Sequence, residues 1–283
     1  MRVIDGRHLG RERVIGCWEL DGVLVDPGPE SCLETLLEAL GGHTPRALLL
    51  THIHFDHAGA AGALVERWPD LPVYVHRRGA RHLAHPERLL SSATRLYGEE
   101  GMRELWGEVV PVPEANLRPL DGGETVLGDF RVEYTPGHAS HHVAYLHEPS
   151  GAAFTVDVAG VRIEPVDLVI APTPPPDIDV EAWERSVDVL RDWRPERLCM
   201  THFGSAENVE EHLEGLVRTL REQAERVRAL DLEGFAAWHR ARVEEVADGE
   251  TAAAFMQAAP PEHLWQGLRR YWDVTAAAGE GPG

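Results

Sequence analysis

The segment from Thr51 to His57 concentrates side chains that bind metal ions. It reads Thr-His-Ile-His-Phe-Asp-His and lies between a short apolar run and a stretch with helical periodicity. Imidazole nitrogens and carboxylate oxygens are common ligands of divalent transition metals. In extended backbone, residues two apart point to the same side, so His52, His54 and Asp56 can converge. His57 begins the helical turn and can reach the same point, so the segment predicts a metal centre.

Three further candidate ligands follow β-rich runs later in the chain. His138, Asp157 and His202 each follow or end such a run, so all three occupy predicted strand ends. Loops at one edge of a sheet can bring remote side chains together on a rigid frame. Two divalent ions need more ligands than the first segment offers, and these three side chains supply them.

The order of these ligands along the chain resembles the metallo-β-lactamase superfamily, especially its glyoxalase II-like members. The matching motifs span residues 51–204. The resemblance implies an α/β fold of the αββα sandwich type, with the metal site at the sheet edge. It also implies two divalent metal ions, zinc in the first place, with iron and manganese as alternatives. The implied ligands are His52, His54 and His138 for one ion, Asp56, His57 and His202 for the other, and Asp157 as the bridge between them.

Two residues near the predicted ligands, His142 and Asp26, are expected to orient them. Related glyoxalase II-like sequences also carry a histidine after Thr-Pro-Gly-His, as His142 does here, and Asp26 resembles the family's early aspartate. The aspartate at position 157 is unlike the cysteine-containing site of the B1-type lactamases. Antibiotic hydrolysis is therefore a poor expectation.

Three aromatic residues are candidate contacts for a substrate. Tyr97 and Trp106 lie in a predicted helical insertion, and Trp183 lies in a later helix. For each of them the alternative is packing between helices. The basic C-terminal signature that would clamp glutathione is not recognisable in this chain, so the identity of the substrate stays open.

The expected chemistry follows from the charge of the site. Two divalent ions facing Asp56, Asp157 and a bridging hydroxide leave a formal charge of about +1, which favours a developing oxyanion. Such ions lower the pKa of bound water from 15.7 towards ~7, so hydroxide becomes available as the nucleophile at neutral pH. Asp56, the expected catalytic residue, could orient that hydroxide or accept its proton. Because we recognise no general acid beside the motifs, a thiolate is a better leaving group than an amine.

The resemblance therefore implies a metal-dependent hydrolase, for which several reactions stay open. Glyoxalase II-like cleavage of a thioester or related ester by a metal-bridging hydroxide comes first. A lactonase or a phosphodiesterase would use the same two-metal site. A persulfide dioxygenase would instead hold one iron through His52, His54, His138 and an Asp157-type ligand. Metal analysis separates one iron from two hydrolytic ions, and a non-catalytic scaffold is the remaining alternative.

The elements that must position these residues follow from periodicity and turn signals. Asp21-Gly22 predicts a hairpin between β-rich runs at 12–20 and 23–26. The uninterrupted apolar run 47–50 predicts a buried strand, and 58–68 predicts a helix. Further strands are expected at 124–127, 130–135, 143–148, 152–157 and 197–200, and a helix is expected at 179–193.

The predicted domain organisation is a catalytic domain followed by helices. Residues 1–204 form the catalytic domain, with a helical insertion at about 81–107 that could act as a lid. Residues 205–275 repeat apolar positions every three or four residues, which predicts a helical C-terminal region without strands. Residues 276–283 are small and glycine-rich, and we expect a flexible tail there.

Charge and composition exclude some partners. The chain has 47 acidic against 27 basic side chains and a formal net charge of −20, which repels nucleic acid and anionic membrane surfaces. The expected partner is a small-molecule substrate, and a homo-oligomer remains open. No secretory signal or long apolar run is recognisable, so we expect a cytoplasmic protein. Cys17, Cys32 and Cys199 lack metal or disulfide spacing and are expected to be buried apolar residues.

Overall fold

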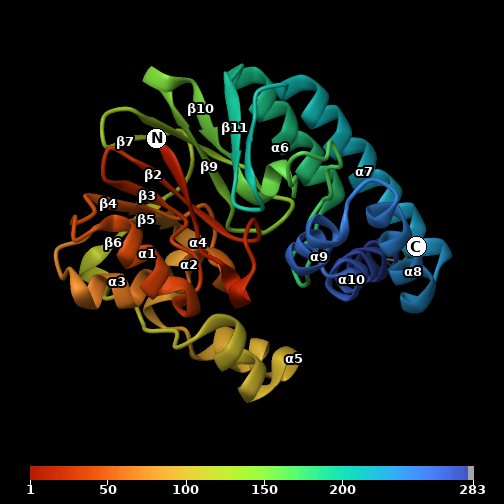
Figure 1. Ribbon diagram of the computed structural model, residues 1–283, viewed down its shortest axis with the longest axis horizontal. Helices are drawn as coiled ribbons and strands as arrows, with labels where there is room; N and C mark the ends of the chain where they lie inside the picture. The colour runs from red at the N-terminus through yellow and green to blue at the C-terminus, as the bar shows by residue number, and fades with distance from the viewer. Residues whose placement is uncertain (280–283) are drawn as a thin grey trace. The chain divides into compact units, whose positions relative to one another are not determined.

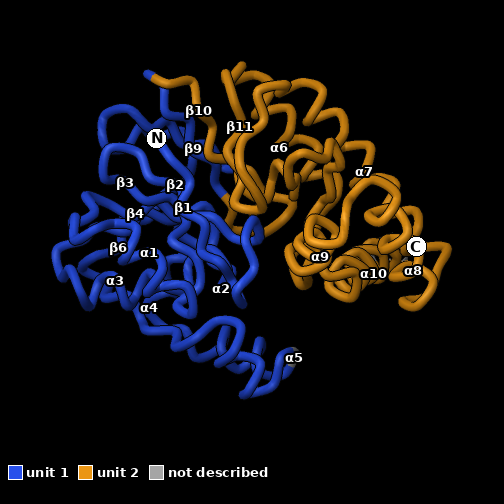
Figure 2. Tube along the Cα trace, in the orientation of Figure 1, with its two compact units in different colours: residues 1–134, 143–149 blue, residues 135–142, 150–283 orange. Residues whose placement is uncertain are grey.

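The structure, a computed structural model, describes residues 1–279, which fall into two compact units (Figure 1). Unit 1 comprises Met1–Tyr134 and Val143–Pro149, and unit 2 comprises Thr135–His142 and the chain from Ser150 onwards (Figure 2). Each unit contains strands and helices of its own. The predicted ligands are therefore divided between the two units.

Unit 1 is built on a mixed sheet. Its strands are β1 (Arg2–Asp5), β2 (Gly16–Leu20), β3 (Val23–Val25), β4 (Ala47–Leu49), β5 (Val73–His76) and β6 (Leu117–Leu120), in this order across the sheet. The first three are antiparallel neighbours, whereas β3 to β6 run parallel. β4 is buried along its whole length, as the apolar run predicted. β1 and β6 were not predicted; Pro119 interrupts the β pattern of β6.

The turn between β2 and β3 is the hairpin that Asp21-Gly22 predicts. Both residues have positive φ, 51° for Asp21 and 78° for Gly22, as a two-residue turn of this kind requires. Leu20 pairs with Val23 directly beside the turn. This register ends β3 one residue before Asp26.

Unit 1 also contains helices and 3-10 turns. The helices are α1 (Leu33–Leu40), α2 (Phe55–Ala58), α3 (Ala61–Arg67), α4 (Arg77–Ala84) and α5 (Glu87–Trp106), and the 3-10 turns are η1 (His8–Gly10), η2 (Glu30–Cys32) and η3 (Glu114–Asn116). Leu36 of α1 and Leu64 of α3 belong to one apolar core with Leu48 and Val73 of the sheet. The predicted insertion is confirmed as helical. The helix predicted at 58–68 is instead two pieces, because α2 begins three residues earlier and α3 starts after a short break.

A second set of strands is divided between the units. In unit 1, β7 (Thr125–Val126), β8 (Phe130–Tyr134) and β9 (Val143–His147) form an antiparallel ladder, which η4 (Glu148–Ser150) follows. In unit 2, β10 (Ala152–Phe154) pairs in parallel with β11 (Arg197–Met200), and β11 pairs antiparallel with β12 (Gly204–Ala206). β12 contradicts the prediction of no strand after residue 204. Its Gly-Ser-Ala sequence has little intrinsic strand preference, so pairing with β11 imposes the conformation.

The chain leaves β10 earlier than predicted. The strand ends at Phe154, and Asp157 lies in the 3-10 helix η5 (Val156–Ala159) rather than at a strand end. Val156 has a φ of 37°, a conformation that costs a β-branched residue about 1–3 kcal/mol. This local strain turns the chain out of the strand and sets the direction of Asp157.

Unit 2 continues with α6 (Val180–Trp193) and the C-terminal helices α7 (Val209–Ala229), α8 (Leu232–Glu244), α9 (Gly249–Ala258) and α10 (Pro261–Gly279). α6 is the predicted helix, and the Asp179 side chain caps it by accepting the Ala182 N–H at 2.8 Å. The expected boundary at residue 204 does not separate the units, because α7 packs on earlier segments of unit 2, with His212 Nε2 2.7 Å from the Ala159 carbonyl. α10 includes residues 276–279 of the expected tail, and 280–283 lie outside the described residues.

Two buried histidines of unit 2, His212 and His239, are expected to make its stability depend on pH. Burial lowers the pKa of His212 and of His239 to about 4. Arg162 beside His212 and Arg242 beside His239 act in the same direction, against carbonyl contacts that raise each pKa. A folded-state pKa below the unfolded value means that the unfolded chain binds more protons between about pH 4 and pH 6.5, so stability falls as pH falls through that window.

We therefore expect each of these histidines to lower the free energy of unfolding by roughly 2 kcal/mol between pH 7 and pH 5. His239→Phe should remove one such contribution, since Phe235 already stacks on the ring of His239 with an interplanar angle of 10°. Urea unfolding of both proteins at the two pH values measures the difference. An equal loss of stability in wild type and variant would show that His239 does not titrate in this way.

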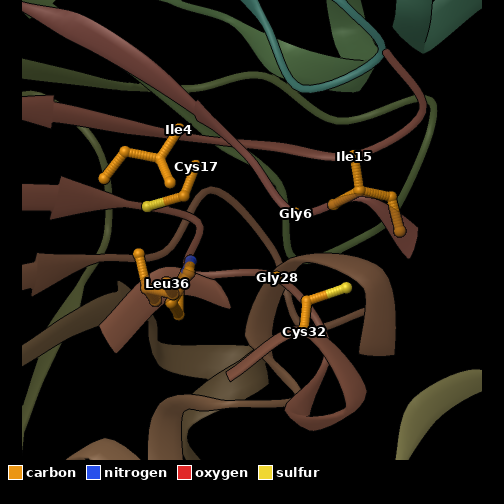
Figure 3. A pocket seen from close by; sticks show the side chains of 8 residues that line it. Ile4, Gly6, Ile15, Cys17, Gly28, Cys32 and Leu36 are labelled. Atoms are coloured by element: carbon orange, nitrogen blue, oxygen red, sulfur yellow. The ribbon is translucent and has the colours of Figure 1, made fainter. Parts of the chain in front are cut away.

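The cysteines are small buried residues, as predicted. Cys17, Cys32 and Cys199 are free thiols, and burial raises the pKa of each, for Cys32 to about 11. The thiols of Cys17 and Cys32 face a small apolar pocket in unit 1 (Figure 3). The other lining residues are Ile4, Gly6, Ile15, Pro27, Gly28 and Leu36. Protonated thiols in an apolar lining supply no nucleophile or metal ligand. Among residues 1–279, no helix is both long and apolar enough to cross a membrane.

Candidate metal centre

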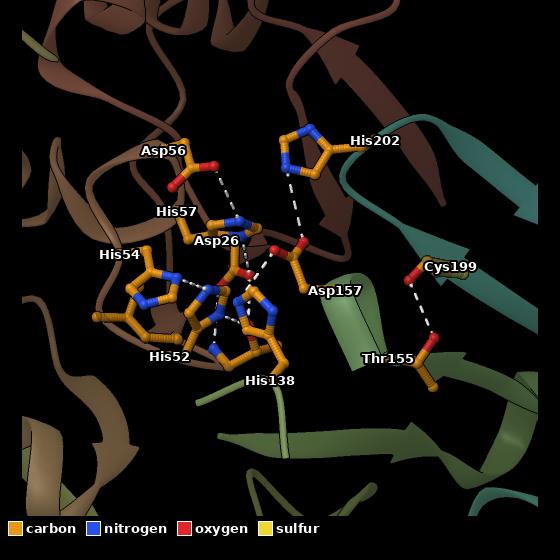
Figure 4. Close-up of polar contacts among 12 residues, drawn as sticks. Asp26, His52, His54, Asp56, His57, His138, Thr155, Asp157, Cys199 and His202 are labelled. Carbon is orange, nitrogen blue, oxygen red and sulfur yellow. Dashed lines mark hydrogen bonds and ion pairs between the residues drawn. The ribbon is translucent and has the colours of Figure 1, made fainter. Parts of the chain in front are cut away.

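In unit 1, four predicted ligands converge in the loop after β4 and in the helix α2 that follows it (Figure 4). His52 Nε2 lies 3.0 Å from His54 Nδ1, the rings of His52 and His57 are 4.1 Å apart, and His57 Nε2 lies 3.5 Å from Asp56 Oδ2. We call these four residues the unit-1 cluster. His52 and His57 are fully buried, whereas His54 and Asp56 are partly exposed. The extended-backbone prediction is correct only as far as His54, because α2 begins at Phe55 and places Asp56 on a helix.

Asp26 fixes the orientation of His57 from the end of β3. Its carboxylate is fully buried and accepts hydrogen bonds from Thr51 N at 2.8 Å, Thr51 Oγ1 at 2.6 Å and His57 Nδ1 at 2.9 Å. A proton on Nδ1 leaves the Nε2 lone pair of His57 for a metal ion. Asp26 also lies near enough to His52 and His57 to be a ligand. Because three donors already occupy its oxygens, we assign it the orienting role.

In unit 2, His138, Asp157 and His202 converge, and we call them the unit-2 cluster (Figure 4). Asp157 Oδ2 lies 3.2 Å from His138 Nε2, and Asp157 Oδ1 lies 3.6 Å from His202 Nε2. All three side chains are buried. Each carboxylate oxygen thus faces a different histidine, an arrangement compatible with a carboxylate that bridges two ions.

The surroundings of His138 determine how its ring is turned. Its Nδ1 donates to the Pro172 carbonyl at 2.8 Å, so Nε2 carries the lone pair on the side of Asp157. The ring of Trp183 packs edge-on against His138 with centroids 5.5 Å apart. Gly137, with a φ of 130°, allows this packing, because a Cβ there would lie 2.3 Å from the Trp183 Cα.

Of the two expectations for Trp183, contact with substrate or packing between helices, its burial favours packing. Its side chain is fully buried, and its indole N–H donates to the Val158 carbonyl at 2.9 Å. Trp183 packs against His138, as the alternative of a packing role predicts.

His142 is fully buried, with Nδ1 2.8 Å from Thr135 Oγ1 and its ring 6.2 Å from that of His138. His142 is therefore placed to support the ring of His138 by packing near it.

The chemistry of both clusters fits divalent metal ions. The buried imidazoles of His57 and His138 each direct one ring nitrogen to an oxygen acceptor, which is Asp26 for His57 and the Pro172 carbonyl for His138. The other ring nitrogen faces an aspartate, which is Asp56 for His57 and Asp157 for His138. This pattern is typical of metal-binding histidines. His52 Nε2 and His54 Nδ1, 3.0 Å apart, must either share one proton or direct lone pairs at a common cation. The buried carboxylates of Asp26 and Asp157 add negative charge that a cation neutralises.

Tyr97 and Trp106 belong to an aromatic group in unit 1. The Trp106 ring lies 5.6 Å from Tyr97, 6.3 Å from Phe55 and 5.6 Å from His8, on which it stacks. Burial first, and the negative charge of Asp56 second, raise the pKa of Tyr97. Tyr97 is therefore close enough to the unit-1 cluster to sense its charge, and both aromatic residues are partly exposed. Their contact with substrate stays a prediction.

Comparison with known proteins identifies related families. The family model described as the metallo-β-lactamase superfamily matches residues 19–202, which include both clusters. A probable metallo-hydrolase, YqgX of Bacillus subtilis (strain 168), is 35% identical over 138 residues, which are 48% of this chain and 60% of that protein. The hydroxyacylglutathione hydrolase of Pectobacterium carotovorum subsp. carotovorum (strain PC1) is 33% identical over 132 residues, 45% of this chain and 39% of that protein. The chain thus matches less than two thirds of the length of either.

Solved structures show the same fold. ST1585, an archaeal protein of the metallo-β-lactamase superfamily from Sulfolobus tokodaii, is 21% identical with a TM-score of 0.67, over 95% of this chain and 97% of that one. TTHA1623 in a di-iron-bound form is 30% identical with a TM-score of 0.55, over 72% of this chain and 93% of that one. These likenesses confirm the expected α/β fold of the metallo-β-lactamase type with its helical C-terminal region.

Proposed function

Since this chain belongs to the metallo-β-lactamase superfamily, we propose that it is a metallo-hydrolase that uses two divalent ions to cleave a thioester or a related ester. The observation that carries the proposal is the pair of contacts from Asp157, with one carboxylate oxygen facing His138 and the other facing His202. This placement supports a carboxylate shared between two ions. The reaction proposed is hydrolysis with two divalent ions.

The proposed ligand assignment follows the order of ligands that the family resemblance implies. One ion would be held by His52, His54 and His138, the second by Asp56, His57 and His202, and Asp157 would contribute to both. Support comes from each cluster separately, through the tautomers that Asp26 and the Pro172 carbonyl impose on His57 and His138. Zinc and iron both suit these nitrogen and oxygen ligands, and TTHA1623 is a relative with a di-iron-bound form.

Different residues of the chain have different roles in the proposed hydrolysis. When bound, the ions lower the pKa of water and polarise the scissile carbonyl oxygen. Asp56 is partly exposed on α2, with Oδ2 3.5 Å from His57 Nε2, and is the carboxylate suited to orient the attacking water and accept its proton. Asp26 keeps the His57 tautomer fixed throughout.

The preference for a thioester rests on the leaving group. A thiolate departs without prior protonation, whereas an amine requires a general acid. No acid is recognisable beside the ligand motifs in the sequence. The hydroxyacylglutathione hydrolases among the relatives carry the name of a thioester hydrolase. Lactones and phosphodiesters are the alternatives that an assay must separate.

We expect metal removal to abolish hydrolysis and to lower the melting temperature. An ion present at 100 times its Kd stabilises the folded state by about 2.7 kcal/mol, or roughly 5–10 °C for a protein of this size. Chelated, reloaded and untreated protein should be compared by thermal melting and on thioester, lactone and aryl phosphodiester substrates. The highest kcat/KM on a lactone or phosphodiester would overturn the thioester assignment, and full activity without metal would overturn the hydrolase mechanism.

A further inference from the structure

Three consecutive buried residues of unit 2, Ala171, Pro172 and Thr173, connect His138 to the C-terminal helices. The middle residue supplies the carbonyl that accepts the His138 Nδ1 proton at 2.8 Å. The residues on either side are each tied to a different helix. All three are buried, and proline in the middle position fixes its own φ.

Gln223 of α7 holds the first of these residues. The Ala171 N–H donates to Gln223 Oε1 at 3.1 Å, and Gln223 Nε2 donates to the Ala171 carbonyl at 3.0 Å. The Gln223 side chain is only 1% exposed. The amide thus pairs with one residue of backbone as a neighbouring strand would, and it satisfies two buried backbone groups that cannot reach water.

Helix α10 holds the third residue. Thr173 Oγ1 donates to the Leu264 carbonyl at 3.1 Å. Gly267, one turn further on, lets the helix approach the loop closely, because a Cβ at that position would lie 2.0 Å from the Thr173 carbonyl oxygen. The Pro172 carbonyl is therefore held between two anchored neighbours.

We propose that Gln223 is a positioning residue for the metal ligand His138, acting through the Pro172 carbonyl. The inference rests on the proposed function, because Gln223 can position a metal ligand only if His138 binds metal. A fixed carbonyl at Nδ1 sets both the tautomer and the rotation of the imidazole, and Trp183 closes the other side of the ring. The C-terminal helices thereby contribute to the metal centre without supplying any of the proposed ligands.

The test measures metal affinity in variants of Gln223. Gln223→Met keeps the length of the side chain and removes both hydrogen bonds to Ala171. Thr219→Val is the matched control, since Thr219 is buried on α7 one turn earlier and accepts from Arg242 Nη2 at 3.0 Å instead of contacting the loop. Zinc affinity of the metal-free proteins is measured by competition with a chromophoric chelator, and thermal melting of the metal-free proteins reports the fold.

We expect Gln223→Met to weaken zinc binding about 10- to 100-fold, with Thr219→Val close to wild type. In a His138→Ala background, Gln223→Met should have no further effect, because the residue through which it acts is absent. An unchanged affinity in Gln223→Met, an equal loss in Thr219→Val, or a full effect without His138 would each overturn the inference. Wild-type protein that binds no zinc or iron would instead refute the proposed function.

Thr173→Val provides a second variant should Gln223→Met not fold. It removes the bond to the Leu264 carbonyl on α10 with little change of volume. We expect a smaller loss of zinc affinity in the same direction. An unchanged affinity, or failure of both variants to fold, would overturn the inference, because the anchors would then serve the fold rather than His138.

Discussion

Asp26→Asn is expected to lower metal affinity by about 10- to 100-fold while the protein remains folded. Oδ1 of Asp26 accepts from Thr51 N, and Oδ2 accepts from Thr51 Oγ1 and His57 Nδ1. If the amide nitrogen of asparagine took the place of Oδ1, its N–H groups would face the N–H of Thr51, and two donors would oppose each other. The amide nitrogen is therefore expected to take the place of Oδ2. It then donates to His57 Nδ1, which moves the ring proton to Nε2 and removes the lone pair from the metal.

The positive φ of Asp26, 49°, is tolerated by asparagine, so the backbone does not confound this substitution. Asp5→Asn is the control, because Asp5 also accepts two backbone N–H groups, from Arg7 and Arg13, outside the unit-1 cluster. Zinc affinity and the nitrogen chemical shifts of His57 measure the effect. Unchanged affinity with His57 still protonated at Nδ1 would refute the orienting role of Asp26.

Asp157→Asn is expected to reduce kcat about 10³-fold, with a much smaller change in KM. The substitution removes one negative charge from between the proposed ions, so their mutual repulsion rises and both should bind more weakly. Loss of several kcal/mol of transition-state stabilisation corresponds to a rate effect of this size. An amide donor would also face His138 or His202 in place of one carboxylate oxygen.

The matched control for Asp157→Asn is Asp179→Asn in the same unit, which makes the same substitution away from the proposed ligands. Asp179 caps α6 through Ala182 N, and asparagine caps a helix equally well. Metal content and steady-state kinetics are measured on one preparation of each protein. Two retained metal ions together with near-normal turnover in Asp157→Asn would exclude the bridging role.

The ligand segment could be predicted from sequence because its spacing is local. His54 has extended backbone, with a φ of −62° and a ψ of 151°, and its Nδ1 lies 3.0 Å from His52 Nε2, as the period of two predicts. Asp157 could be identified by the family resemblance but not placed correctly, because its direction depends on the positive φ of Val156. β-branched residues rarely adopt that conformation, so no propensity indicates it.

The groups that orient the ligands were harder to predict. Asp26 has a carboxylate and a recognisable place in the chain, whereas the Pro172 carbonyl is a backbone group that any residue could provide. Gln223 is separated from Ala171 by 52 residues, and only tertiary packing brings the two together. The sequence leaves two roles open for Trp183, because aromatic side chains occur both in binding sites and in cores, and its burial favours the core.

Metal content per chain, measured by elemental analysis together with activity, tests the central proposal most directly. Metal-free protein should be titrated with zinc and with iron, and thioester hydrolysis followed at each addition. The two-metal mechanism predicts two divalent ions per folded chain and hydrolysis that reaches its maximum only when both are bound. Full activity with no metal, or one iron per chain with oxygen consumption and no hydrolysis, would contradict it.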